Sequence, residues 1–540
     1  MKTACMAALI SFTAISVSAK PGNYNIIPEP VEIVTNGEGT FRLSRNADIT
    51  VSDTILNFEA RYLADYADRY LGIPLNTDNT TGKAAISLVN KNNGEVSGGY
   101  RLSVSADNGV VIEGNDAAGV FYGVQTLIQL LPTRAGVIPS LPEVVINDYP
   151  RFEYRGMHLD VVRHFFPIEY VKRYIDYLAM HKLNYFHWHL SDDQGWRIEL
   201  KSYPGLTQSG SEREGEIFGL YPGKYQELPY GGYYTQQQIR DVVSYATDRH
   251  ITVVPEIDIP GHCMAVLATY PAFSTTPDEQ KKCALTWGIY DKFNNVLAPT
   301  PEVFEFLKNV FSEVCDLFPG QYIHAGGDEC AKRWWHESSQ AQDFMRKHKL
   351  KDEAALQGYF SHFVQDVIKS KGKTMVGWDE VMEGDVSEDC VIMNWRKPEE
   401  GLKAIEKGHK TIFACSKWCY LNIVESRLQD EIGAKSATPL SVEKVYSFQI
   451  MPDSISDKDK KLVLGAQGAM WTEYIPTTWK LEKFLFPRLA ALAENVWTSE
   501  DKKSWDNFAT KVERQTERYE LWGARYSDAF FRMNDIKRYR

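Results

Sequence analysis

Residues 155–193 have the sequence RGMHLDVVRHFFPIEYVKRYIDYLAMHKLNYFHWHLSDD. Two apolar runs, at 155–161 and 185–190, flank a segment from Ile168 to Leu178 in which apolar side chains recur at helical spacing. Pro167 precedes this segment, and proline suits the first turn of a helix. A strand, a helix and a second strand in this order form the repeating unit of a parallel sheet, so we predict a β–α–β unit here.

The same alternation continues towards the C-terminus. Six further short apolar runs, each of a length typical of a buried strand, are separated by segments with helical periodicity. They lie at residues 251–257, 322–325, 374–378, 391–395, 410–414 and 462–466. Eight strands with intervening helices predict an α/β fold, a (β/α)8 TIM barrel over residues 151–500.

The segment before the barrel has a different pattern. Residues 100–112 alternate polar and apolar side chains on either side of an Asp-Asn-Gly turn, which predicts a hairpin, and helical patterns occupy about 54–71 and 116–131. We therefore predict a small N-terminal α/β domain at residues 20–150. Residues 501–540 are predicted to form a C-terminal helical extension packed on the barrel.

The extreme N-terminus has the features of an export signal. Lys2 precedes an apolar stretch from Ala4 to Val17, and Val17-Ser18-Ala19 is a small-residue cleavage site. We predict a signal peptide at residues 1–19 and export to the periplasm, the cell surface or the extracellular space. Seven of the eight cysteines follow Ala19, and this odd number favours mostly buried free thiols over a disulfide framework.

Composition narrows the possible functions. The formal net charge is −11, which argues against a nucleic-acid-binding protein, because such a protein needs basic patches to neutralise phosphates. After the N-terminal segment the sequence has no apolar run of about 18 residues, so no membrane span is expected.

Acidic, aromatic and histidine side chains gather at the predicted strand ends. In a TIM barrel the C-terminal ends of the strands meet at one face, which carries the active site. Carboxylates that bind hydroxyl groups and rings that pack on pyranose faces make this a candidate sugar site. The residues are Asp160, Arg163, His189, Asp192, Asp193, Glu256, Asp258, His262, Asp328, Glu329, Trp378, Glu380, Trp395, Tyr420, Asn422, Trp471 and Glu473.

Simpler explanations exist for individual residues at these strand ends. A strand-end aspartate such as Asp160 or Asp193 is often a helix N-cap, and each tryptophan is also compatible with core packing. The neighbouring His187, His189, Asp192 and Asp193 are acceptable metal ligands, but their spacing matches no known metal motif. No catalytic metal is therefore expected.

The adjacency of Asp328 and Glu329 indicates a particular chemistry. A retaining glycosidase that supplies its own nucleophile places two carboxyl groups about 5 Å apart, on opposite sides of the scissile bond. Two neighbours in sequence diverge from one point of the backbone and are poorly placed for this. They suit substrate-assisted hydrolysis instead, in which one carboxyl protonates the leaving oxygen and the other orients the attacking 2-acetamido group.

The sequence resembles the family 20 glycoside hydrolases, the β-N-acetylhexosaminidases. HAGGDE at 324–329 carries the resemblance most strongly, and the other matching motifs occur in the same order as in the family. They are RGMHLDVVRHF at 155–165, FHWHLSDD at 186–193, PEIDIPGH at 255–262, the later tryptophans, YLN at 420–422 and WTE at 471–473. The segment before residue 150 also resembles the small N-terminal domain of this family.

This resemblance implies roles for the catalytic residues. Glu329 is the general acid, and then the general base when water opens an oxazolinium intermediate. Asp328 binds the acetamido N–H and stabilises developing positive charge, and Tyr420 donates to the acetamido oxygen. Asp192 and His262 form a relay behind Glu329.

The resemblance also implies a set of substrate-binding residues and no cofactor. The three tryptophans enclose the acetamido methyl group and the sugar face, Arg163 and Glu473 hold ring hydroxyls, Asn422 lies near O4 and O6, and Asp258 supports the relay. The substrate-binding set is therefore Arg163, Trp378, Trp395, Asn422, Trp471, Glu473 and Asp258. Many relatives carry aspartate in place of Asn422, which leaves the preference between gluco and galacto configuration open.

The expected function is exo-acting removal of terminal β-linked N-acetylhexosamine, either GlcNAc or GalNAc, from glycans. Two alternatives remain open at this point. One is release of a disaccharide, as by a lacto-N-biosidase, which needs a wider pocket floor. The other is a catalytically silent carbohydrate-binding protein, although such a protein would be free to lose the acid Glu329.

Overall fold

The computed structural model describes most of the chain. The described residues are 24–538, except 78–83, 220–222, 288, 429–432, 435–437 and 453. The predicted signal peptide lies outside them. In the described part, no helix is both long and apolar enough to cross a membrane.

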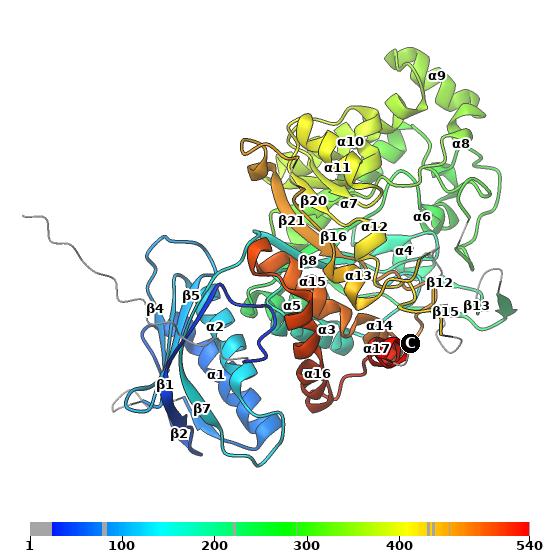
Figure 1. Cartoon of the computed structure of the whole chain (residues 1–540). Coiled ribbons are helices and arrows are strands. Elements are labelled where there is room, and N and C mark those ends of the chain that lie inside the picture. The colour runs from blue at the N-terminus through cyan, green and yellow to red at the C-terminus, as the bar shows by residue number, and fades with distance from the viewer. Residues whose placement is uncertain are drawn as a thin grey trace, which may run out of the picture.

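The first domain is a mixed sheet with two helices on one face (Figure 1). Its strand order is β1-β7-β5-β6-β4-β2-β3, and the predicted hairpin is present, since β5 and β6 pair antiparallel from Ser105 and Gly109. The strands are β1 Glu32–Arg42, β2 Ala47–Val51, β3 Leu75–Asn76, β4 Ile86–Asn90, β5 Tyr100–Ser105, β6 Gly109–Gly114 and β7 Ser140–Asp148. Helices α1, Asn57–Tyr66, and α2, Ala117–Leu130, lie between this sheet and the second domain.

The second domain is a closed parallel barrel of eight strands, so the predicted fold class is confirmed. All eight expected strands are present, with ends within about two residues of the expected positions. They are β8 Tyr154–Asp160, β9 Tyr185–His189, β16 Thr252–Glu256, β17 Tyr322–His324, β18 Thr374–Trp378, β19 Val391–Asn394, β20 Thr411–Phe413 and β21 Val463–Gly468. These strands are almost entirely buried, because helices cover the barrel outside and side chains fill it inside.

The outer helices follow the strands with one exception. The main ones are α3 Ile168–Met180, α5 Gln236–Asp248, α7 Pro301–Leu317, α10 Glu353–Ser370, α11 Pro398–Glu406 and α15 Arg488–Trp497. Helix α3 begins one residue after Pro167, which is its N-cap rather than its first helical residue. Between β18 and β19 only a short 3-10 segment, Asp379–Gly384, forms, because residues 379–390 are a crossover of minimal length.

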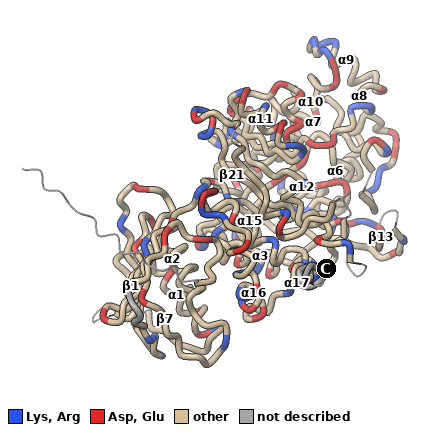
Figure 2. The backbone as a smooth tube through the Cα atoms, viewed as in Figure 1, with Lys and Arg blue, Asp and Glu red and all other residues tan. Residues whose placement is uncertain are grey.

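Two helices complete the chain beyond the barrel. They are α16, Trp505–Leu521, and α17, Ala529–Arg538. The buried Arg518 of α16 donates to the carbonyl oxygens of Asn25 and Gln129, which joins this helix to the first domain. Figure 2 shows basic and acidic residues interspersed along the backbone, and neither sign forms a continuous face in this view.

A buried ion pair fastens the two domains together. Lys182, from the turn before β9, lies 3.0 Å from Asp148 at the end of β7, and both side chains are fully buried. The Lys182 ammonium also donates to the Tyr100 hydroxyl, and the Trp497 indole N–H donates to Asp148. The first domain is therefore joined to the barrel by charge as well as by apolar contact.

Replacing Lys182 by methionine is expected to destabilise the protein by about 3–5 kcal/mol, because the variant leaves the Asp148 carboxylate buried without its cation. The thermal unfolding midpoint, followed by circular dichroism, measures the effect. Lys461→Met, at an exposed lysine, is the matched control. Equal midpoints for the two variants would show that the pair contributes no stability.

Candidate active site

The guanidinium of Arg163 is fixed at the C-terminal end of β8. It contacts Asp160 at 3.2 Å and Asp192 at 2.8 Å, and it donates to Gln194 Oε1 at 2.9 Å. Asp160 also accepts from the backbone N–H groups of Val162 and Arg163. The strand-end aspartate therefore orients the arginine and does not cap a helix.

Two side chains, Asp192 and His262, form a relay to Glu329, the second carboxylate of the HAGGDE segment. His262 Nδ1 lies 3.1 Å from Asp192, and its Nε2 lies 3.7 Å from Glu329. Burial disfavours the imidazolium, but Asp192 outweighs burial and raises the pKa of His262 well above its ordinary value. His262 in turn lowers the pKa of the Glu329 carboxyl. In the free protein the pair therefore shares one proton, which is held mainly by His262.

Asp258 and Asp328 form a second pair of interacting groups. One oxygen of each carboxyl lies within 4.8 Å of the other, and His262 Nε2 is 3.9 Å from Asp328. Burial raises the pKa of both carboxyls, and repulsion by Asp328 raises that of Asp258 further, well above its ordinary value. Asp258 therefore retains the shared proton and leaves Asp328 as the anion.

The two glycines of HAGGDE allow the backbone to turn beneath these carboxylates. Gly326 and Gly327 have φ of 64° and 102°, and a Cβ atom on Gly326 would lie 1.7 Å from Asp258 Oδ1. Gly327 N–H donates to that same oxygen at 3.0 Å. Only glycine fits this approach, and the turn directs both Asp328 and Glu329 to the barrel mouth.

Aromatic rings form the opposite side of the site. Trp395 and Tyr420 stack with ring centroids 6.1 Å apart, and Tyr420 lies 6.2 Å from Trp471. Trp378 packs behind Trp471, at 6.0 Å, and is almost fully buried. The Trp395 indole N–H donates to Glu380 at 2.8 Å, which fixes this ring.

Together these groups line a cavity of about 150 Å³ at the barrel mouth. Five buried polar atoms of its lining residues have no hydrogen-bond partner in the described structure: Asn422 Oδ1, Trp471 Nε1, Glu473 Oε2, Asp328 Oδ1 and His262 Nε2. Unpartnered buried polar atoms are costly, so their convergence on one pocket indicates a polar ligand. The lining residues are Arg163, His262, Asp328, Glu329, Trp395, Tyr420, Asn422, Trp471 and Glu473.

Most of the residues selected from the sequence therefore meet at one place. Asp192 and Asp258 lie behind the cavity as supports, and Trp378 lies beneath its wall rather than on it. Sequence reasoning assigned no role to Asp160 and Glu380 beyond their strand-end positions, and it missed Gln194 altogether. Glu380 and Gln194 contact residues that follow other strands, so no local pattern marks them, whereas Asp160 holds Arg163 three residues further along the same segment.

The long loop at 203–234 lies beside the site and not in its lining. Its described residues contribute nothing to the lining of the 150 Å³ cavity. Glu214 and Ile217 instead line a second cavity of about 510 Å³. That cavity also includes Met264, two residues after His262, so the loop borders the region just outside the site.

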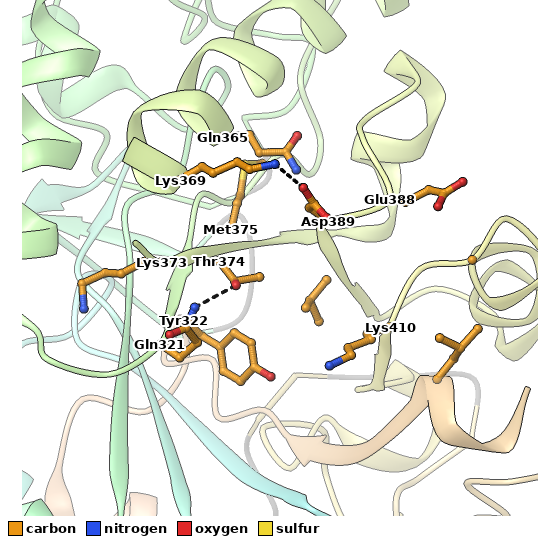
Figure 3. A pocket seen from close by; sticks show the side chains of 13 residues that line it. Gln321, Tyr322, Gln365, Lys369, Lys373, Thr374, Met375, Glu388, Asp389 and Lys410 are labelled. Carbon is orange, nitrogen blue, oxygen red and sulfur yellow. Dashed lines mark hydrogen bonds and ion pairs between the residues drawn. The ribbon is translucent and has the colours of Figure 1, made fainter. Parts of the chain in front are cut away.

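A larger cavity, of about 630 Å³, lies at the opposite end of the barrel (Figure 3). It is lined by the N-terminal ends of strands, among them Tyr322 and Thr374, and by Lys369, which pairs with Asp389. Its position argues against a catalytic role, because the functional groups of a TIM barrel occupy the other end. Volume alone does not identify the active site here.

All seven cysteines in the described chain are free and buried, as predicted. Burial raises the pKa of the Cys330 thiol, next to Glu329, to about 12. It is therefore an unreactive packing residue at neutral pH.

Comparison with known proteins agrees with this geometry. The family model "Glycosyl hydrolase family 20, catalytic domain" matches residues 152–500, and the model of domain 2 of that family matches residues 23–149. The chain belongs to glycosyl hydrolase family 20.

Individual relatives within family 20 share both sequence and structure with the chain. A β-hexosaminidase of Porphyromonas gingivalis is 38% identical, over 97% of this chain and 68% of the relative. A β-N-acetylhexosaminidase of Cellulomonas fimi is 31% identical, over 93% of this chain and 95% of the relative. The solved structure of an exo β-N-acetylglucosaminidase from Vibrio harveyi, in complex with N-acetylglucosamine, has 32% identity and a TM-score of 0.84, over 96% of this chain and 81% of that one. The chain is thus a glycosidase of the β-N-acetylhexosaminidase type.

Proposed function

We propose that the chain removes a terminal non-reducing β-linked N-acetylhexosamine with retention of configuration, using the acetamido group of the substrate as the nucleophile. The observation that carries this mechanism is the divergence of Asp328 and Glu329 from one turn into one pocket. The remaining carboxylate of the pocket lining, Glu473, lies near Arg163, and we assign it to the ring hydroxyls rather than to an enzymic nucleophile. The anionic Asp328 is instead suited to accept a hydrogen bond from an acetamido N–H.

In the first step, the acetamido oxygen attacks the anomeric carbon and the bond to the leaving oxygen breaks. His262 passes the shared proton to Glu329, which gives it to that oxygen and is left as a carboxylate. Asp328 accepts a hydrogen bond from the acetamido N–H and balances the positive charge of the resulting oxazolinium. In the second step, Glu329 takes a proton from water, the water oxygen bonds to the anomeric carbon, and the acetamido group is restored.

The binding groups suit a single sugar ring. Arg163 and Glu473 are placed to bind ring hydroxyls, and Trp471 provides an apolar face. A cavity of about 150 Å³ accommodates one ring rather than two, which favours monosaccharide release over disaccharide release. Asn422 offers both a donor and an acceptor near the hydroxyls, so we propose that equatorial and axial O4 are both accepted.

We also propose that the protein acts outside the cytoplasm. The apolar stretch from Ala4 to Val17 and the small residues ending at Ala19 support this location. Amino-terminal sequencing of the mature protein tests the proposal, and a mature chain that still begins at Met1 would contradict it.

The mechanism predicts hydrolysis of aryl β-N-acetylglucosaminide and of its galacto epimer, but not of the plain β-glucoside, which lacks the nucleophile. A thiazoline mimic of the oxazoline is expected to inhibit competitively, because it resembles the charged intermediate. Release of aryl alcohol at steady state measures both. Equal rates on the plain glucoside, or no inhibition by the thiazoline, would contradict substrate assistance.

A further inference from the structure

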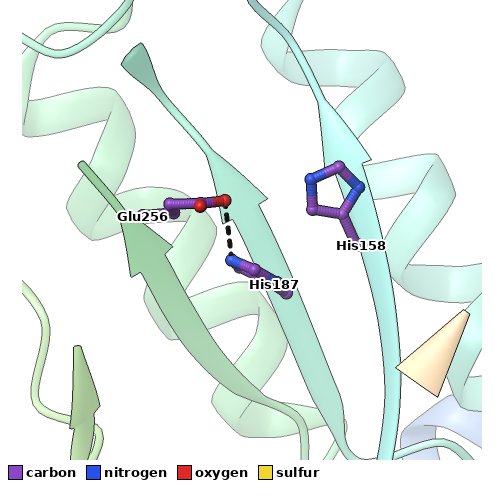
Figure 4. A group of neighbouring side chains, drawn as sticks. All are labelled: His158, His187 and Glu256. Carbon is purple, nitrogen blue, oxygen red and sulfur yellow. Dashed lines mark ion pairs between the residues drawn. The ribbon is translucent and has the colours of Figure 1, made fainter. Parts of the chain in front are cut away.

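A polar cluster inside the barrel lies directly beneath the catalytic relay. Its centre is Glu256, at the end of β16, whose side chain is fully buried. The carboxylate lies 2.6 Å from His189 Nδ1 and accepts from the Trp378 indole N–H at 2.8 Å. His187 Nε2 lies 3.0 Å from it (Figure 4). Three N–H groups thus converge on one buried carboxylate, which indicates an anion.

His189 joins this carboxylate to the relay. Its second ring nitrogen, Nε2, lies 3.0 Å from Asp192. Burial disfavours the imidazolium, but Glu256 and Asp192 outweigh burial and raise the pKa of His189 to about 10. His189 is therefore a cation held between two carboxylates, and it donates one N–H to each.

We propose that Glu256 is a positioning residue for the catalytic acid: it holds His189 as a cation and thereby fixes the orientation and charge of Asp192 in the relay to Glu329. The chain of contacts runs from Glu256 through His189, Asp192 and His262. This inference rests on the proposed function of Glu329 as acid and base.

The same carboxylate also supports the wall of the site. Its bond to Trp378 fixes an indole that packs behind Trp471. His324 Nδ1 lies 3.2 Å from it but accepts from the N–H of Gly326, so this ring donates no hydrogen bond from Nδ1 to the carboxylate. One buried charge therefore contacts both the relay to Glu329 and the support of the aromatic wall.

A metal ion is a less suitable explanation of this cluster. His158, His187 and Glu256 lie near enough to one another to hold a cation. However, the Glu256 oxygens already contact the ring N–H groups of Trp378 and His189. His187 Nδ1 accepts from Gln467, so Nε2 carries its hydrogen and faces Glu256 as a donor. Of the three side chains, only His158 keeps ring nitrogens that contact neither a hydrogen-bond partner nor a carboxylate in the described structure, and one ligand does not make a metal site.

The expected pH dependence follows from the charges around His189 and Glu256. The charged and titratable groups that face them and the relay are His158, His187, Asp160, Arg163, Asp192, Asp193, Asp258, His262, His324 and Asp328. Asp192 keeps its contact with Arg163, and His262 its contact with Asp193, in every variant considered below. Glutamine at position 256 removes one of the two anions that hold the proton on His189, so burial makes this ring neutral. Asp192 then has one positive partner fewer and holds the His262 proton more tightly. The charge of Glu256 itself is one hydrogen bond further from His262, so its loss offsets only part of this effect.

The test is the pH profile of kcat/KM for Glu256→Gln with an aryl β-N-acetylglucosaminide. Since the basic limb reports loss of the proton shared by His262 and Glu329, we expect it to move to higher pH by about half to one unit. The maximum is expected to fall about tenfold or more, because His262 gives up its proton less readily. Glu494→Gln, at another buried carboxylate far from the site, is the matched control and is expected to leave the limb in place.

Each outcome distinguishes this inference from the proposed function. A basic limb that is unmoved, or moves to lower pH, in folded Glu256→Gln contradicts the inference, because Asp192 then keeps its charged partner. If that variant does not fold, His189→Gln removes the same cation. The inference then requires the basic limb of its kcat/KM profile to move to higher pH. A wild-type chain that fails to hydrolyse the glycoside contradicts the proposed function itself.

Discussion

Glu329→Gln is expected to lower kcat/KM by about 10²–10⁴ on a β-N-acetylglucosaminide whose leaving group is a poor one, such as phenol or a second sugar. The amide has nearly the shape of the acid but gives no proton to the leaving oxygen. Glu329 has a side chain that is 46% exposed and lies at the rim of the pocket, so the substitution disturbs little of the surrounding structure.

The diagnostic measurement compares leaving groups of different acidity. The 4-nitrophenolate of a 4-nitrophenyl glycoside leaves as a stabilised anion and needs little protonation. The loss of kcat/KM in Glu329→Gln is therefore expected to be smaller on this glycoside than on the phenyl glycoside. Glu337→Gln, an exposed carboxylate after the same strand, serves as the control. Equal losses of kcat/KM on the two glycosides would show that Glu329 is not the general acid.

The pH profile gives an independent check on Glu329. In the wild type, the proton needed for the leaving group is shared by His262 and Glu329, and its loss produces the basic limb. His262 lowers the pKa of Glu329, so the acid receives this proton from the histidine rather than from bulk water. Glutamine at position 329 removes the acceptor of that proton, and the basic limb of kcat/KM is expected to disappear.

The barrel was predictable because its signals are local. Each strand is a short apolar run in the sequence, and α3 has an unbroken apolar face, so their order along the chain leads to the closed sheet. The crossover between β18 and β19 was not predictable in this way. Its 3-10 segment depends on the close contact of Gly384 with Gly358 of α10, a contact between distant parts of the sequence.

The residues of the candidate site also divide into those with a local sequence signal and those without one. Asp328 and Glu329 stand out because their adjacency has a chemical consequence. Glu380 and Glu256 do not, because each acts on a tryptophan or histidine from another strand. The sequence also does not reveal charge states. His189 is a cation because its ring is buried between two carboxylates, and no local feature of the sequence indicates this.

Asp328→Asn is expected to lower kcat/KM by about 10²–10³, the loss typical of removing one preorganised group that stabilises charge at the transition state. The wild-type carboxylate is anionic because Asp258 keeps the proton that the pair shares. An amide at this position offers the acetamido N–H a weaker acceptor and leaves the oxazolinium charge unbalanced. With one anion removed, the pKa of Asp258 is expected to fall, since repulsion by Asp328 is one of the causes that raise it.

The pattern across substrates separates this variant from Glu329→Gln. Formation of the oxazolinium accompanies departure of every leaving group, so Asp328→Asn is expected to slow the phenyl and 4-nitrophenyl glycosides by similar factors. Binding of the thiazoline mimic is expected to weaken as well, because the inhibitor carries the charge that Asp328 balances. Asp343→Asn, at an exposed aspartate after the same strand, is the control. A loss confined to the phenyl glycoside, with thiazoline binding unchanged, would mean that Asp328 acts through the neighbouring acid and not on the acetamido group.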